Sequence, residues 1–416
     1  MLNTFYDSYR ILMKVYGQKS YIKQAINSEV IEPINRSTVI KICYGVVEND
    51  ILLDYILSAY CDKRPKLPVR VVLKIALYNL RFLDKSPYAV TDNAVELLKK
   101  LGKGANAGFA NAVLRKYVKS GDVLTFPEEY RKKLSVLFSW PGFAINMLES
   151  YYGKETTEKI VSYREPHNYL RFDKSVDGEK YLTERGKKFI PTPFYNLFDV
   201  GNFVREDGYD QGLYTFQSIG SVAICDAVPS GKILFDCCAA PGGKSVLLSD
   251  KFEKVYSFEL HEHRARLIDE YAGRMGKTNV SVITADSSVR NDEYVVRADA
   301  VLCDCPCSGF GVACENPDVK LNKTEENVKE LAKTQLTILK NCSDYVKKGG
   351  YLVYSTCSVF AEENDRVIDA FAPEKSGFEV VDVESPLCGL KTRRGTQFLP
   401  HISMGAGFYI CKMRKI

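Results

Sequence analysis

The sequence predicts an all-helical N-terminal region, a small α+β linking segment and a C-terminal α/β domain built on a largely parallel sheet. Three observations indicate this class. Apolar residues recur at helical spacing in the first third of the chain, short apolar runs alternate with helical stretches in the second half, and glycine-rich or acidic residues follow several of those runs. A length of 416 residues fits two or three domains. The expected segments are 1–125, 126–215 and 216–416.

Composition places the chain among globular proteins. Hydrophobic residues make up 45% and charged residues 26%, and no apolar run approaches the roughly 20 residues that a membrane helix needs. The N-terminus lacks a basic region followed by an apolar one, so we expect no secretory signal and a cytoplasmic, monomeric protein without a membrane partner. We expect the 13 cysteines to be reduced thiols. The C-x-C-x-C run at 303–307 lacks a second pair and a nearby histidine, so no metal site is predicted.

Apolar stripes predict packed helices in the N-terminal third. Two stripes follow the spacing i, i+3, i+4, i+7, i+8 on either side of Asn49. Their members are Val39, Ile42, Cys43, Val46 and Val47, then Leu52, Tyr55, Ile56, Ala59 and Tyr60. A helix over 69–83 is apolar nearly all round and should be the most buried. We expect a further helix capped by Thr91, and a last one over 109–117.

Basic charge is concentrated in the same region. The net charge of the chain is +5, and residues 1–140 are net positive whereas the remainder is net negative. Solvated helix faces or a footprint for nucleic-acid phosphates would both explain this asymmetry. The stretches 44–47, 67–80 and 107–115 resemble the NusB-type RNA-binding domain over about residues 1–125. That resemblance implies an RNA contact through the basic surface of this region.

Alternating strands and helices predict the C-terminal sheet. The expected strands cover residues 233–236, 255–259, 280–283, 300–303 and 351–355. Their near-continuous apolar character is typical of parallel strands buried on both faces. Ligands of such sheets bind beyond the carboxyl ends of the strands. The segment 126–215 is less regular, with a helical stretch near 141–152, a short β-like run at 169–172 and proline-containing loops.

A turn rich in small residues follows the first of these strands. It contains Cys238, Ala239, Ala240, Pro241, Gly242, Gly243 and Lys244. A phosphate-binding loop would need glycine at the position of Cys238, and the dinucleotide pattern G-x-G-x-x-G is also absent, so neither class is favoured. The turn binds a ligand closely or joins a strand tightly to a helix. At later strand ends, Glu259 could accept ribose hydroxyls and Asp286 could meet an adenine amino group.

Two cysteine motifs follow neighbouring predicted strands. They are Asp304-Cys305-Pro306-Cys307-Ser308-Gly309 and Tyr354-Ser355-Thr356-Cys357-Ser358. A thiolate that adds to C6 of cytosine makes C5 nucleophilic toward a sulfonium methyl, and the C5 proton must then leave before the thiol is released. Asp304 is placed to share a proton with N3 during the addition. A second thiol nearby could assist the release.

These motifs resemble bacterial 16S rRNA cytosine-C5 methyltransferases of the Fmu/Sun family over essentially the whole chain. The turn at 238–244, both cysteine motifs, Glu362-Glu363-Asn364 and Phe398-Leu399-Pro400-His401 carry the resemblance. It implies the seven-stranded methyltransferase version of the doubly wound, Rossmann-like sheet, with S-adenosylmethionine on residues 238–244, Glu259, Asp286 and Asp304. It also implies that Cys357 adds to C6 and that Cys307 helps to release the product.

Alternatives to this interpretation concern the substrate and the activity itself. The chain departs from the family at Ala313-Cys314-Glu315-Asn316, at Ala406 and at Cys305, which puts the RNA contacts and the target base in question. DNA or tRNA methylation would use the same catalytic residues. An RNA-binding assembly or antitermination factor with a non-catalytic methyltransferase-like domain is the alternative from another class.

Overall fold

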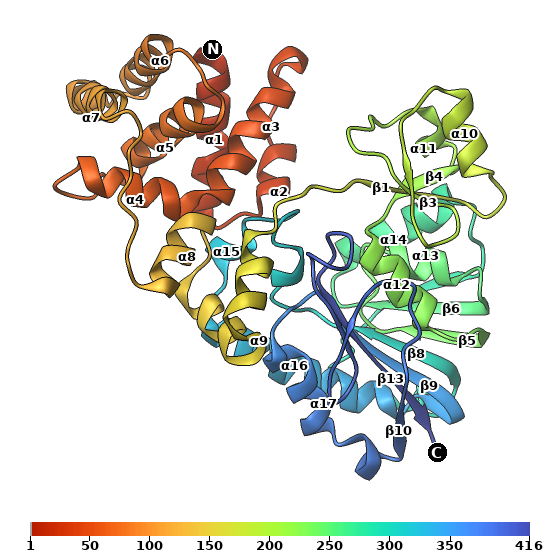
Figure 1. The fold of residues 1–416 in the computed structure, drawn as a ribbon. Coiled ribbons are helices and arrows are strands. Elements are labelled where there is room, and N and C mark those ends of the chain that lie inside the picture. Colours follow the sequence, from red (N-terminus) through yellow and green to blue (C-terminus); the bar gives the residue numbers. More distant parts are fainter. Residues whose placement is uncertain (1) are drawn as a thin grey trace. The chain divides into compact units, whose positions relative to one another are not determined.

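The computed structural model describes residues 2–416, which form two compact units with separate cores (Figure 1). The first unit contains the chain up to residue 162 together with residues 316–323. The second contains residues 163–315 and 324–416. The methyltransferase-like strands of the sequence analysis all lie in the second unit.

The first unit is all-helical, as predicted for its first 125 residues. Its elements are α1 (Leu2–Gln18), α2 (Ile22–Asn27), α3 (Pro33–Glu48), α4 (Asp50–Tyr60), α5 (Leu67–Phe82), α6 (Pro87–Lys100), η1 (Gly104–Asn106), α7 (Ala107–Lys119), α8 (Tyr130–Phe138), α9 (Gly142–Ser162) and α15 (Val319–Asn322). A short distant segment also belongs here, because Asp318 accepts a hydrogen bond from the Ile22 amide at 3.0 Å.

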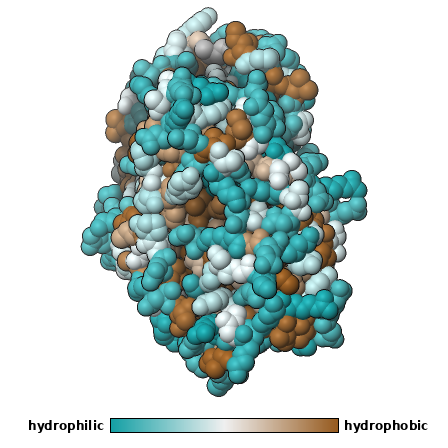
Figure 2. All heavy atoms as spheres, turned by 90° about the vertical axis from the view of Figure 1, so that its right-hand side faces the viewer, coloured by the Kyte–Doolittle hydropathy of each residue, from teal (hydrophilic) through white to brown (hydrophobic). Residues whose placement is uncertain are grey.

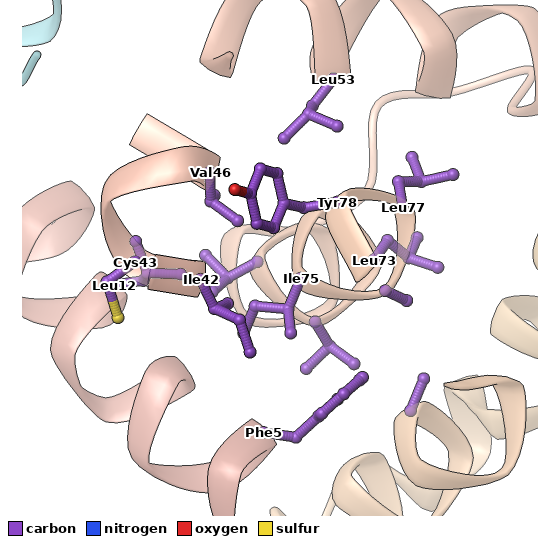
Figure 3. Close-up of a cluster of buried hydrophobic side chains, with 14 of the residues drawn as sticks. Phe5, Leu12, Ile42, Cys43, Val46, Leu53, Leu73, Ile75, Leu77 and Tyr78 are labelled. Carbon is purple, nitrogen blue, oxygen red and sulfur yellow. The ribbon is translucent and has the colours of Figure 1, made fainter. Parts of the chain in front are cut away.

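Helix α5 is the centre of the first unit. Ile75 and Leu77 are fully buried, and Figure 3 shows side chains from α1, α3 and α4 gathered around those of α5. Even the amine of Lys74 is buried, and it forms ion pairs with Asp50 and Asp54 of α4. The predicted central helix is therefore confirmed. An all-round apolar helix must be covered on every side, which the surrounding helices achieve.

Two features of this unit differ from the sequence analysis. Thr91 does not cap its helix, because α6 begins one turn earlier at Pro87. The proline ring fixes φ near the helical value, and the first turn of a helix has no acceptor for the amide that proline lacks. Pro87 therefore favours a helix that begins at this residue. Helix α1 was not predicted, although its buried Phe5, Ile11 and Leu12 form a helical stripe.

A small antiparallel sheet begins the second unit. Its strand order is β2-β3-β1-β4, and helices α10 and α11 accompany it. The bounds are β1 (Tyr169–Phe172), α10 (Gly178–Glu184), β2 (Ile190–Pro191), β3 (Leu197–Asp199), α11 (Asp207–Asp210) and β4 (Tyr214–Phe216). Aromatic rings of Phe172, Tyr181 and Tyr214 contact one another in its core.

The large sheet has the order β11-β12-β13-β9-β8-β5-β6-β7, with β10 also paired to β13. Its strands are β5 (Gly231–Asp236), β6 (Phe252–Glu259), β7 (Val280–Thr284), β8 (Ala298–Asp304), β9 (Val346–Thr356), β10 (Phe378–Val381), β11 (Leu390–Lys391), β12 (Thr396–Phe398) and β13 (Phe408–Lys415). Strands β5 to β9 are parallel, and β13 runs antiparallel to β9. The sheet is the expected doubly wound type. It has nine strands where seven were expected, because short strands crowd the edge beside β13.

Helices cover both faces of this sheet, which explains why the central residues of its parallel strands are mostly apolar. Leu234 packs with α12 residues on one face, whereas its neighbour Phe235 packs with α16 residues on the other. The remaining elements are α12 (Ile219–Ala227), α13 (Gly243–Leu248), α14 (Glu262–Arg274), η2 (Asp292–Tyr294), η3 (Phe310–Val312), α16 (Glu325–Ser343), η4 (Ala361–Glu363), α17 (Asp365–Phe371) and η5 (Pro373–Ser376).

The surface agrees with a chain that buries its apolar residues. Figure 2 shows hydrophobic residues in small separate groups among hydrophilic ones on the face that it presents. Among residues 2–416, no helix has the length and hydropathy needed to cross a bilayer.

A glycine in α3 allows its close approach to α5. A Cβ built on Gly45 would lie 2.0 Å from the ring of buried Tyr78, so Gly45→Ala must displace that ring. We expect a loss of about 1–3 kcal/mol in the free energy of unfolding, measured by urea denaturation. Gly108→Ala in α7 is the matched control, because nothing lies within 4 Å of its added Cβ. The control should be neutral or stabilising, and equal losses in both variants would contradict the close-contact explanation.

Candidate active site

The turn after β5 is fixed by backbone hydrogen bonds to its neighbours. The Cys237 amide donates to Leu302 O of β8 at 2.9 Å, and the Ala239 amide donates to Phe258 O of β6 at 3.0 Å. Gly242 has φ 103°, and a Cβ there would lie 3.1 Å from the backbone of Ile268 in α14. The turn therefore lies between two parallel strands with its backbone close to α14, as the small residues predicted.

Two acidic side chains lie at the next two strand ends. Glu259 ends β6 and is 4% exposed, and its Oε1 accepts the His261 amide and pairs with Arg264 at 3.3 Å. Asp286 follows β7 and is exposed, with Oδ1 accepting the Ser288 amide at 2.8 Å. The Ala285 amide donates to Glu259 O, which joins the two strand ends. Both predicted acids therefore lie at the same edge of the sheet.

Asp304 is held at the end of β8 by groups from two other elements. Lys244 Nζ of α13 lies 2.5 Å from its Oδ2, and Ser355 Oγ of β9 donates to its Oδ1 at 2.7 Å. Burial lowers the pKa of Lys244, but the charge and hydrogen bond of Asp304 outweigh that effect and raise it overall. Lys244 therefore stays charged and fixes the direction of the Asp304 carboxylate.

The two predicted cysteines face each other. Cys307 Sγ and Cys357 Sγ are 2.9 Å apart, and the Cys357 amide donates to Cys307 Sγ at 3.3 Å. Strands β8 and β9 are parallel neighbours with Asp304 opposite Ser355, so the loops that follow them meet. The hydrogen bond to Cys357, burial and the charges of Glu363 and Asp304 raise the pKa of Cys307 well above its usual value. Cys307 therefore holds its proton at neutral pH.

A buried carboxylate that the sequence analysis did not single out joins both cysteine loops. Glu363 is fully buried, and it accepts hydrogen bonds from the Ser308 amide at 2.7 Å and from the hydroxyls of Ser308 and Ser358 at 2.5 Å. Gln335 Nε2 of α16 is a further donor at 3.1 Å. Ser308 and Ser358 directly follow the two cysteines. The only signal in the sequence was the stretch 362–364, quoted for resemblance without a role.

Two glycines fix the backbone of Cys357. The Gly311 amide donates to Cys357 O, and the Gly407 amide donates to Gly311 O, both at 3.0 Å. A Cβ on Gly311 would lie 1.9 Å from Gly407 O and 2.8 Å from Cys357 O. Neither glycine has room for a side chain. The loops that contain Gly311, Cys357 and Gly407 therefore pack backbone against backbone beside the Cys357 thiol.

The sequence-predicted residues thus come together along one edge of one sheet. The turn at 238–244, Glu259, Asp286, Asp304, Cys307 and Cys357 lie at or just beyond the carboxyl ends of β5, β6, β7, β8 and β9. Such an edge binds nucleoside-type ligands in doubly wound sheets. With two thiols in contact beside it, the fold and the site define a methyltransferase of the S-adenosylmethionine-dependent class.

Comparison with known proteins gives the family. The model of the 16S rRNA methyltransferase RsmB/F family matches residues 224–414, and that of the NusB family matches residues 8–119. The probable ribosomal RNA small subunit methyltransferase B of Bacillus subtilis is 33% identical over 97% of both chains. The chain therefore belongs to the RsmB/F methyltransferase family, with a NusB-like region at its N-terminus.

Solved structures share the fold. The crystal structure of PH0851 has a TM-score of 0.84 and 21% identity, and the match covers 100% of this chain and 98% of that one. NSun6 from Pyrococcus horikoshii, solved with SFG, has a TM-score of 0.57 and 19% identity over 70% of this chain and 98% of that one. The predicted family and fold class are confirmed.

A buried carboxyl at the end of β5 makes stability depend on pH. Burial raises the pKa of Asp236 to about 6, with the Ser245 hydroxyl opposing and the charge of Asp304 adding to that effect. Between about pH 4 and pH 6 the folded protein therefore binds more protons than the unfolded chain, so this group lowers stability as the pH rises. We expect Asp236→Asn to remove a decrease on the order of 3 kcal/mol over that window. Urea unfolding midpoints of both proteins at pH 4 to 7 measure it, and parallel pH profiles would contradict the assignment.

Proposed function

We propose that this protein transfers a methyl group from S-adenosylmethionine to C5 of a cytosine in small-subunit rRNA, through a covalent bond between Cys357 Sγ and C6. The observation that carries the proposal is the contact of Cys357 with Cys307 at adjacent strand ends, next to the fixed carboxylate of Asp304. The names of the relatives support the ribosomal substrate. Because a stacked base cannot reach such a site, the target cytosine must be flipped out or unpaired.

The edge of the sheet fits the methyl donor. In this proposal Glu259 accepts hydrogen bonds from the ribose hydroxyls of S-adenosylmethionine, and Asp286 accepts one from the adenine amino group. The turn at 238–244 and Asp304 contact the rest of the donor. Glu259 supports this role because its carboxylate is buried yet lies at a strand end, where a ligand hydroxyl can replace water. When bound, the donor supplies a methyl group on a positively charged sulfur.

The protein's own residues divide the reaction into steps. The Cys357 thiol gives up its proton and the thiolate attacks C6, while N3 takes up a proton that it shares with the Asp304 carboxylate as charge develops there. Lys244 and Ser355 keep Asp304 aimed during this step. After C5 is methylated, its proton leaves to a base, the C5–C6 double bond re-forms, and the Cys357 thiolate departs.

Cys307 suits the later step because its acidity changes during the reaction. The largest cause of its raised pKa is the hydrogen bond with Cys357. Once Cys357 Sγ is bonded to carbon, that cause disappears and the pKa of Cys307 falls. Cys307 therefore holds its proton during the attack, can afterwards lose it to solvent, and as a thiolate can then accept the C5 proton when Cys357 is released.

Removing the nucleophile should abolish the reaction. We expect Cys357→Ala to lower the rate of methyl transfer to unmodified small-subunit rRNA to background, while calorimetry shows unchanged S-adenosylmethionine binding. Cys388→Ala removes an exposed cysteine and is the control. Methyl transfer by the Cys357 variant above a few per cent of the normal rate would exclude it as the nucleophile.

Removing the second thiol should trap the adduct. In Cys307→Ala the addition of Cys357 proceeds but release is slowed, so a protein–RNA band should accumulate on a denaturing gel with RNA and S-adenosylmethionine. The double variant with Cys357→Ala should show no band. A band that required Cys307 and not Cys357 would reverse the two roles.

A non-catalytic RNA-binding factor remains the alternative activity. It predicts no measurable S-adenosylmethionine binding to the wild-type chain. The assembled donor-side carboxylates and paired thiols support the enzyme, because an RNA-binding role needs neither.

The NusB-like region offers a surface for RNA. A concavity of about 440 Å³ between the α4–α5 loop and the start of α7 is lined by Lys63, Arg64, Lys66, Lys103 and the exposed ring of Phe109, among others. Cations neutralise phosphates, and an exposed aromatic face can stack on an unpaired base. We propose this concavity as an RNA contact of the first unit.

Charge removal tests the RNA contact. Replacing Lys63, Lys66 and Lys103 by glutamine should weaken binding to small-subunit rRNA at least tenfold at low salt. It should also reduce the slope of log K against log salt by roughly two. The matched control replaces Lys23, Lys132 and Lys159, which are exposed elsewhere on the same unit. Equal losses in the two triple variants would place the contact elsewhere.

A further inference from the structure

Three buried sulfur atoms meet beneath the turn that follows β5. Cys237, Cys303 and Cys342 have their Sγ atoms within 4.8 Å of one another, and their side chains are 2%, 0% and 0% exposed. They come from the end of β5, from β8 and from α16. None of them has a part in the proposed reaction.

The cluster contains thiols and no other ligand type. The Sγ atoms of Cys237 and Cys303 form hydrogen bonds with Cys342 Sγ, and these lower the pKa of Cys342 although burial opposes the effect. Cys238 and Cys305 form a second hydrogen-bonded thiol pair close by. Five of the 13 cysteines are therefore gathered in one region of the core.

The spacing suits one soft cation. Metal–sulfur bonds of about 2.3 Å in trigonal or tetrahedral geometry separate the sulfurs by about 4 Å, which is within the observed limit. Thiolates favour Cu⁺ and Zn²⁺ over hard cations. Binding would release the thiol protons, because cysteine holds such ions as the thiolate, and the positive charge of the ion offsets the cost of burying the thiolates.

We propose that Cys237, Cys303 and Cys342 form a binding site for one thiophilic d¹⁰ cation, Zn²⁺ or Cu⁺. The ion would tie β5, β8 and α16 together below the turn at 238–244. Because the site is closed to solvent, the ion would enter during folding or local opening. The Ser287 hydroxyl donates to Cys237 O at 2.6 Å, so Cys237 also fixes the position of the segment that follows Asp286.

Metal binding by the untagged, reduced full chain tests the proposal. The protein is refolded without oxygen in the presence of Zn²⁺ or of Cu⁺ and dialysed against a competing chelator, and its metal content is then measured. We expect one tightly held equivalent of one of these ions in wild type and at least a tenfold loss of affinity in Cys303→Ala and Cys342→Ala. Cys411→Ala, which removes a single buried thiol outside the cluster, should bind like wild type.

Two further measurements make each outcome decisive. Cys357→Ala should also bind like wild type, and loss of the ion in that variant would assign the metal to the catalytic thiol pair and overturn the proposal. X-ray absorption at the metal edge of the wild-type chain needs no folded variant, and it should show three sulfur neighbours at about 2.3 Å. If the dialysed protein retained no ion, or if X-ray absorption showed nitrogen and oxygen atoms as the neighbours of the metal, the three cysteines would be packing residues only.

Discussion

The buried carboxylate of Glu363 is the constraint on which the proposed chemistry depends. A carboxylate without water is costly to bury unless its oxygens are hydrogen-bonded, and here four donors reach it from three elements. Two of the three donor residues, Ser308 and Ser358, directly follow the two cysteines. Their loops leave different strands and have no covalent link, so Glu363 joins them through side-chain hydrogen bonds and helps to hold the thiols close to each other. The Tyr354 hydroxyl donates a hydrogen bond to Glu363 O, which fixes the backbone of Glu363 to β9.

The parallel register of the sheet brings the two cysteine loops together, and the hydrogen bonds of Glu363 then fix their exact positions. With Asp304 opposite Ser355, the residues that follow β8 and β9 must emerge side by side. The Cys305 amide continues the pairing by donating to Ser355 O. Beyond that point the chains diverge from strand geometry, and the contacts of Gly311, Gly407 and Glu363 replace the ladder. The two thiols therefore lie just beyond the regular strands, in loops whose backbone is still fixed by hydrogen bonds.

The sequence was sufficient for those features that depend on strand ends. Each of the five expected strands exists, and the rule that parallel strands end at one edge brought Glu259, Asp286, Asp304 and the two cysteines together. The short edge strands β10, β11 and β12 were not predicted, because two to four residues give too little alternation. Helix α6 starts at Pro87 and not near Thr91, since a proline in the first turn outweighs a possible capping hydroxyl.

Tertiary contacts account for what sequence reasoning could not reach. Glu363 looks like any acidic residue in a charged stretch, and its importance exists only once Ser308, Gln335 and Ser358 surround it. The thiol cluster is similar. Cys237 and Cys303 can be placed on neighbouring strands from the sequence, but Cys342 joins them only through the packing of α16 on the sheet. The sequence predicted no metal site because the C-x-C-x-C run at 303–307 lacks a second pair and a nearby histidine, and spacing along the chain does not bring Cys342 into view.

In the proposed function, the charges at the strand ends favour binding of the positively charged S-adenosylmethionine over binding of its demethylated product. Asp236, Glu259, Asp286 and Asp304 outnumber Lys244 and Arg264 at these strand ends, so the edge is net negative whether or not Asp236, with its pKa of about 6, is ionised. S-adenosylmethionine carries a positive sulfur that its demethylated product lacks. In the proposed reaction, attraction to this edge would therefore weaken when the methyl group leaves, and two unit charges about 4 Å apart near a protein surface interact by about 4 kcal/mol. In the proposed function, the carboxylates assigned to the donor would thus also favour replacement of the product by a new donor once the reaction is complete.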